Sequence, residues 1–69
     1  MFLEMNTVKG TRCFVNVRYI DSFWVDCEGF LHITAVGYDT GSWKIKTSLD
    51  DFISLLKNVG IEVVEGDNV

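Results

Sequence analysis

The sequence predicts a small α+β domain: a curled antiparallel sheet of about five strands, partly open and barrel-like, with one C-terminal amphipathic helix packed on it. Three observations lead to this fold class. Upstream of residue 48, apolar and polar residues alternate with a period near two, which is typical of half-buried strands. Residues 49–59 repeat at helical spacing instead, and glycine-containing turns separate the segments. The 69 residues make one domain, placed at residues 1–64, and residues 65–69 are expected to fray.

The helix is predicted from its periodicity and from both of its ends. Five apolar residues lie on one stripe of residues 49–59: Leu49, Phe52, Ile53, Leu56 and Val59. Ser48 is the expected N-cap, with Asp51 in a capping-box-like position. Gly60 suits the left-handed position after the last turn, and Ile61 can complete a Schellman cap.

The strands are predicted from alternation and from the turns that bound them. We expect them at residues 2–8, 12–18, 22–26, 30–36 and 42–47, with residues 61–64 as a candidate short edge strand. The apolar positions then give one buried face, consisting of Leu3, Met5, Cys13, Val15, Val17, Phe23, Val25, Leu31, Ile33, Ala35, Trp43 and Ile45.

The turn at residues 26–29 fixes the register of the central hairpin. Asp26 at its first position and Gly29 at its last are typical of a type I turn followed by a G1 bulge. This geometry places Val25 opposite Leu31. A two-residue loop would shift the register by one residue and exchange the two faces, so burial favours the first register.

Two cysteines, Cys13 and Cys27, are too few for the disulfide framework of a secreted domain. If residues 19–21 bend between paired strands, Cys13 faces Cys27, and a bridge requires Cα atoms within about 7 Å. A reducing cytosol would leave two free thiols. Residues 1–6 lack a basic segment and a long apolar run. We therefore expect no signal peptide, no membrane span and a cytoplasmic location.

No pattern of catalytic, metal-binding or cofactor-binding residues stands out. His32 has no serine or acidic residue close enough in sequence to indicate a nucleophile–base pair. Asp50 and Asp51 are explained by the first helical turn, where carboxylates interact with the helix dipole. One histidine and two separated cysteines give no metal spacing. We therefore expect no enzyme activity, no metal and no cofactor.

The outward face of the sheet is unusually aromatic for a solvated surface. Its candidate interface residues are Phe14, Trp24, Phe30, His32 and Val36. Three interpretations remain open: scattered surface aromatics, a tighter barrel that buries both faces, or a contiguous patch that meets a protein partner or a second copy. Nine aromatics in so short a chain favour the patch, because a small domain has little interior in which to bury them.

A nucleic-acid interpretation uses the same face. Basic residues share the outward parity with Phe14, Trp24 and Phe30, and these basic residues are Arg12, Arg18, Lys44 and Lys46. Aromatics flanked by basic residues can stack the bases of single strands. The net charge of −4 argues against a nucleic-acid partner. Single-strand binding therefore stays the alternative function.

Residues 12–58 have the layout of a known family. An apolar strand at residues 14–18, with Asn16 within it and Ile20 at a following bend, leads through a hairpin and a short strand into residues 48–52. This order resembles the small bacterial flagellar and swarming-motility proteins, and also short uncharacterised proteins of bacteria and phages. The resemblance implies a regulatory or binding role without catalytic residues. Because the outer face is aromatic, the function predicted is a small non-catalytic protein-binding or regulatory module of bacterial or phage origin, which acts through that face as a homo-oligomer.

Overall fold

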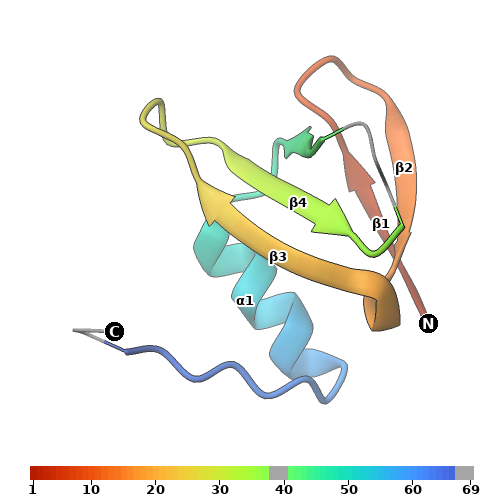
Figure 1. Cartoon of the computed structure of the whole chain (residues 1–69), viewed down its shortest axis with the longest axis vertical. Helices are drawn as coiled ribbons and strands as arrows, with labels where there is room; N and C mark the ends of the chain where they lie inside the picture. The colour runs from red at the N-terminus through yellow and green to blue at the C-terminus, as the bar shows by residue number, and fades with distance from the viewer. Residues whose placement is uncertain (38–40, 67–69) are drawn as a thin grey trace.

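The computed structural model describes residues 1–37 and 41–66, and these contain five strands, a 3-10 helix and one α-helix (Figure 1). The elements are β1 (Phe2–Asn6), β2 (Arg12–Asn16), η1 (Val17–Tyr19), β3 (Ile20–Val25), β4 (Leu31–Ala35), β5 (Trp43–Ile45) and α1 (Leu49–Asn58). All strand pairs are antiparallel. The predicted α+β class with one C-terminal helix is therefore confirmed.

The strands form two sheets, which a short bridge connects. β1 pairs with β2, and β3, β4 and β5 follow one another in a second sheet. Thr7 and Ile45 form an antiparallel bridge between the sheets, and the N–H of Val8 donates to the carbonyl of Lys44 at 3.0 Å. The strands therefore curl around the core without closing into a barrel, as the partly open form predicts.

The second strand ends earlier than the sequence predicts. Residues 17–19 form η1, and the side chain of Asn16 caps it by accepting the N–H of Arg18 at 3.1 Å. Ser, Thr, Asn and Asp side chains commonly divert the backbone from a strand in this way. The chain therefore leaves the first sheet at Asn16 and enters the second sheet at Ile20.

This crossing also corrects the expected pairing of the cysteines. β2 pairs with β1 and not with β3, so Cys13 lies opposite Met5 and does not face Cys27. Both thiols are free. Cys13 is half-buried beside the core, and burial raises the pKa of its thiol, whereas Cys27 is exposed in the hairpin turn.

The central hairpin has the predicted register. Val25 lies opposite Leu31 and Phe23 opposite Ile33. The N–H of Asp26 donates to the carbonyl of Phe30 at 2.9 Å, and Gly29 takes a φ of 91°, which only glycine adopts readily. The turn therefore selects the register that puts the apolar residues of both strands on one face.

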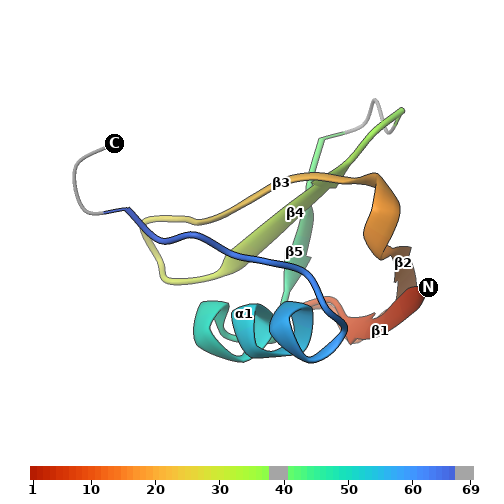
Figure 2. The ribbon, with the colours of Figure 1, turned by 90° about the horizontal axis from the view of Figure 1, so that it is seen from below.

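The core lies between that face and α1, which runs across it (Figure 2). Phe52 is fully buried, and its ring meets Phe23 edge-on with centroids 5.0 Å apart. Burial of side chains of this size contributes about 1.5–3 kcal/mol each. The buried residues are Leu3, Met5, Val15, Leu31, Ile33, Ile45, Phe52, Ile53 and Leu56.

Both helix ends follow the prediction. The hydroxyl of Ser48 accepts the N–H of Asp51 at 3.2 Å. Gly60 takes a φ of 87° and donates its N–H to the carbonyl of Lys57 at 3.0 Å, while the N–H of Ile61 donates to the carbonyl of Leu56 at 2.9 Å. This pair of bonds is the Schellman arrangement. The helix itself ends at Asn58, one residue before the predicted boundary.

Three further expectations differ from the structure or lie outside it. Val25 is predicted to lie in the core but is 40% exposed, because it lies on an edge strand of its sheet, where neighbouring apolar side chains cover it incompletely. Residues 61–64 form no strand, although Val63 packs against the core. The loop entering β5 includes residues 38–40, which lie outside the described residues, as do residues 67–69 of the tail.

Candidate functional site

The outer face, meaning the side of β3, β4 and β5 that points away from α1, carries a cross-strand row of three residues. Trp24 lies opposite His32, and His32 lies opposite Lys44. The rings of Trp24 and His32 stack with centroids 5.3 Å apart and planes only 6° from parallel. Each of the three strands therefore supplies one member of a continuous row.

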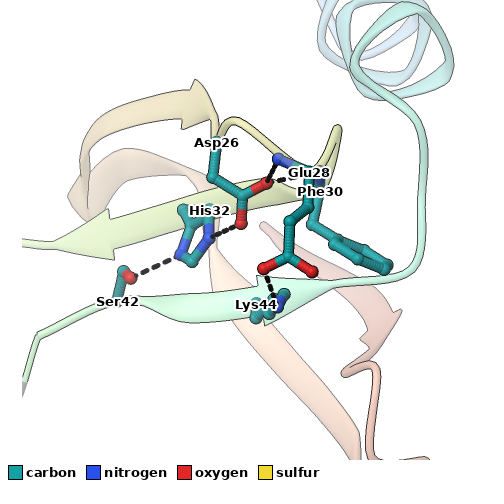
Figure 3. Close-up of polar contacts among 6 residues, drawn as sticks. All are labelled: Asp26, Glu28, Phe30, His32, Ser42 and Lys44. Carbon is teal, nitrogen blue, oxygen red and sulfur yellow. Dashed lines mark hydrogen bonds and ion pairs between the residues drawn. The ribbon is translucent and has the colours of Figure 1, made fainter.

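His32 is held at both ring nitrogens (Figure 3). Its Nε2 lies 2.7 Å from Oδ2 of Asp26, and its Nδ1 lies 2.8 Å from the hydroxyl oxygen of Ser42. An ionised carboxylate only accepts hydrogen bonds, so Nε2 carries the proton. In the neutral imidazole, Nδ1 then accepts the hydroxyl proton of Ser42. We call these three residues the polar cluster.

Asp26 joins the polar cluster to the hairpin turn. Its other oxygen, Oδ1, accepts the N–H of Glu28 and the N–H of Phe30, each at 2.9 Å. The hydrogen bond from His32, and then those from the turn, lower the pKa of the Asp26 carboxyl from 3.8 to about 2. The carboxylate thus stabilises the turn and orients the imidazole at the same time.

Lys44 extends the row toward the turn. Its ammonium lies 4.4 Å from the centre of the Phe30 ring and 3.9 Å from a carboxylate oxygen of Glu28 (Figure 3). An ammonium over a ring face is attracted by the negative face of the π system. Phe30 is therefore positioned beside the row even though it precedes β4.

The outer face combines partly buried polar groups with exposed rings. The side chains of His32 and Asp26 are 18% and 21% exposed. Trp24 and Phe30 are 44% and 37% exposed. The polar groups are thus shielded and hydrogen-bonded, while the aromatic rings present apolar surface to solvent.

The structure brings together three of the five predicted interface residues. Trp24, Phe30 and His32 lie together on the outer face. Val36 is 67% exposed but lies just beyond the end of β4. Phe14 lies on β2, in the other sheet.

Phe14 belongs to a different kind of surface, on the outer side of the β1–β2 hairpin. Glu4 lies opposite Phe14, and the Arg12 guanidinium both pairs with Glu4 and lies 5.4 Å from the Phe14 ring centre. The hydrogen bond to Glu4 raises the pKa of Arg12. Phe14 itself is 57% exposed. This surface is a solvated ion pair beside a ring.

The sequence indicated no acidic or serine partner for His32, but the fold brings Asp26 and Ser42 to its two ring nitrogens. His32 has outward parity on β4, and Asp26 and Ser42, which flank β3 and β5, continue the outward parity of those strands, so alternation gave a partial signal. The turn register also places Asp26 opposite Phe30, and Phe30 is the nearest residue before His32 that has the same outward parity. The position of Ser42 beside His32 depends on the β4–β5 register, which the turn at Asp26 does not determine.

The polar cluster has the connectivity of an acid–imidazole–hydroxyl relay, in which a base can activate a hydroxyl nucleophile. An open groove of about 410 Å³ passes beside Ser42. Its lining residues are Thr7, Val8, Lys9, Thr11, Ser42, Trp43 and Lys44. Within residues 1–37 and 41–66, no three His, Cys, Asp or Glu side chains gather in a way that could hold a metal ion.

Comparisons with protein-family models, with curated proteins and with solved structures found no match to this chain. The resemblance to flagellar and swarming-motility proteins therefore stays a prediction. No helix of the described segments combines the length and the apolar character that crossing a membrane requires.

Proposed function

We propose that the chain is a small non-catalytic binding module that contacts proteins through the outer face of β3, β4 and β5 and acts as a homo-oligomer. One observation carries this proposal: Trp24 and Phe30 are exposed, yet each is fixed by a neighbour on the same face. Tryptophan and other large aromatics dominate the energetics of protein interfaces. A surface that holds such rings in place has the composition of an interface core.

The polar cluster supports the proposal by reducing the cost of binding. Association immobilises side chains, and each rotamer-rich side chain that is ordered costs about 0.5–1.5 kcal/mol. Trp24 is already stacked on His32, and His32 is already held by Asp26 and Ser42. The face therefore meets a partner with little additional ordering.

The non-catalytic part of the proposal rests on the role of Asp26. Its carboxylate accepts two backbone hydrogen bonds that close the hairpin turn. The arrangement of Asp26, His32 and Ser42 is therefore explained by its role in the fold, without a catalytic role. Incubation with an activated aryl ester tests this directly. We expect the same slow release of phenol from the wild-type chain and from the Ser42→Ala variant. A burst of phenol that requires Ser42, with an acyl adduct on that residue, would contradict the proposal.

A protein partner is favoured over a nucleic acid by the charges on the two surfaces. Lys44 approaches Glu28, and Arg12 pairs with Glu4, so both cations have carboxylates beside them. Phe14, one of the three rings of the nucleic-acid alternative, lies on the other sheet. Titration with single-stranded oligonucleotides at low salt, where electrostatic attraction is strongest, is expected to show no binding. The free thiols of Cys13 and Cys27 fit the proposed cytoplasmic setting.

Quenching of Trp24 fluorescence tests whether the outer face becomes covered. Trp43→Phe leaves Trp24 as the sole tryptophan. We expect acrylamide to quench it less as the protein concentration rises, because association covers the indole. The matched Trp24→Phe variant reports on Trp43, whose quenching should change little. Equal quenching of Trp24 at every concentration, in a chain that stays monomeric, would contradict the proposed self-association.

A further inference from the structure

The open edge of β3 is the second unusual feature of this sheet. β3 is an outer strand, and among the described strands it pairs only with β4. Backbone groups in an antiparallel pair point alternately toward and away from the partner. Asp26 points toward β4, since its N–H donates to Phe30, and Trp24 therefore does so as well. The N–H and C=O groups of Phe23 and Val25 consequently face the open edge.

Nothing in the described part of the chain satisfies this edge. The backbone hydrogen bonds that residues 1–37 and 41–66 make outside their strand ladders include none from Phe23 or Val25. Figure 2 shows the segment after Gly60 running from the end of α1 toward the level of β3, but no backbone hydrogen bond joins the described residues of this segment to β3. Natural edge strands are normally protected by lysine, proline or a covering segment. Residues 22–25 of β3 read Ser-Phe-Trp-Val and contain no lysine or proline, and no described segment hydrogen-bonds to their open side.

We propose that a second copy of the chain pairs with this edge, β3 against β3 in antiparallel orientation, about a two-fold axis at Trp24. The inference rests on the self-association proposed above and gives it a location. It joins two three-stranded sheets into one continuous sheet with both helices on the same side. The two outer faces then form a single surface centred on a pair of Trp24 rings, which stays available to a protein partner.

The register follows from which residues face each other. With the axis at Trp24, Phe23 of one copy lies opposite Val25 of the other, and their edge-facing backbone groups form hydrogen bonds. Trp24 faces its symmetry mate at a non-hydrogen-bonded position, where side chains are closest and aromatic pairs are favourable. The residues paired nearest the axis, Phe23, Trp24 and Val25, are uncharged. The next pair joins Ser22 of one copy to Asp26 of the other, so no two like charges face each other. A two-fold contact requires this self-complementarity.

The proposed pairing also accounts for two exposures. Val25 has the inward parity of the core but is 40% exposed, and Trp24 is 44% exposed. Both residues lie at the proposed contact, so the second strand covers Val25 and one flank of each Trp24 ring, while the outer side of the ring stays exposed. A heterologous strand could hydrogen-bond to the same backbone groups, but only a second β3 offers the complementary Trp24 and Val25 as well.

Cysteine cross-linking tests the register. In a Cys13→Ala, Cys27→Ala background, Trp24→Cys should form a disulfide-linked dimer under mild oxidation, because the paired Cα atoms lie about 4.5 Å apart. Ser22→Cys is the matched control on the same strand and face. In this register its symmetry mate is about 13 Å away along the strands, beyond disulfide reach. Equal cross-linking of both variants, or none in either, would overturn the proposed pairing.

A second variant retains Trp24 and the outer face. Val25→Lys places a charge at the edge while its side chain can extend toward solvent. We expect dimer affinity to fall at least about tenfold with an unchanged circular dichroism spectrum, because buried charge at an edge opposes strand pairing. If the wild type is a dimer but Val25→Lys dimerises equally well, the edge assignment fails and the proposed self-association stands. If the wild type is a monomer, both fail.

Discussion

Each sheet carries an aromatic ring beside a cation on its outer side, Phe14 beside Arg12 and Phe30 beside Lys44, yet the two outer sides differ in how their side chains are held. On the β1–β2 hairpin, Arg12 pairs with Glu4 over an exposed Phe14. On β3, β4 and β5, the ring of Trp24 stacks on His32, which is held from both sides. The first surface consists of solvated groups whose mutual attraction water weakens. The second is an ordered network in which both ring nitrogens of His32 and both carboxylate oxygens of Asp26 have hydrogen-bond partners.

This difference teaches that aromatic content alone does not identify an interface. Phe14 is more exposed than Trp24, at 57% against 44%, yet it lies beside a solvated ion pair. Trp24 lies in a row that spans three strands. The ordering of the neighbours, rather than the exposure of the ring, separates the two surfaces.

The largest effect is expected from removing the imidazole. His32→Ala deletes the stack on Trp24 and two hydrogen bonds, which should lower the free energy of unfolding by about 2 kcal/mol. Chemical denaturation with the slope held constant measures this change. The matched control is His32→Gln, which retains a hydrogen-bonding amide and should lose less. If His32→Ala is as stable as the wild type, the network is not an ordered unit.

A smaller loss of stability is expected at acid pH, from protonation of Asp26 in the polar cluster. The pKa of Asp26 falls from 3.8 to about 2 on folding. A lowered folded-state pKa stabilises the fold above the unfolded value, and this contribution is lost as pH falls from about 4 toward 2. Asp26→Asn should therefore lower stability at neutral pH and flatten the acid limb of the stability profile.

The control for this prediction is Asp21→Asn, which removes an exposed carboxylate from β3 and leaves the cluster intact. Its stability should fall with acid as steeply as that of the wild type. Thermal unfolding monitored by circular dichroism across this pH range gives both profiles. An Asp26→Asn profile that parallels the wild type would show that the carboxylate does not act as described.

The smallest effect is expected on the other sheet. Glu4→Gln removes the partner of Arg12 from an exposed pair, and exposed pairs contribute little because water and salt screen them. The midpoint of denaturation should not change measurably, at low or at high salt. A loss as large as that of His32→Ala would remove the contrast between the two surfaces.

The sequence predicted the parts of the fold that local chemistry determines. The caps of α1 follow from Ser48 and Gly60, and the register of the central hairpin follows from Asp26 and Gly29. The pairing of β2 was not predictable in this way, because it depends on a side-chain bond from Asn16 that ends the strand. Alternation of apolar residues does not show where such a side-chain bond ends a strand and sends the chain to another sheet.

The same limit explains which part of the candidate site was predictable. Alternation placed Trp24 and His32 on one face, and the turn register brought them together. Ser42 joined them only through the pairing of β4 with β5, across a loop whose composition sets no register. The ion pairs that separate Phe14 from the outer face likewise depend on which sheet contains β2.

The most direct test of the proposed self-association is sedimentation velocity of the wild-type chain and of Val25→Lys over a wide range of concentration. We predict that the wild type sediments as a dimer at high concentration and dissociates on dilution, while Val25→Lys stays folded and monomeric at concentrations where the wild type is dimeric. A wild-type chain that sediments as a monomer throughout would contradict both the homo-oligomeric module and the pairing of β3.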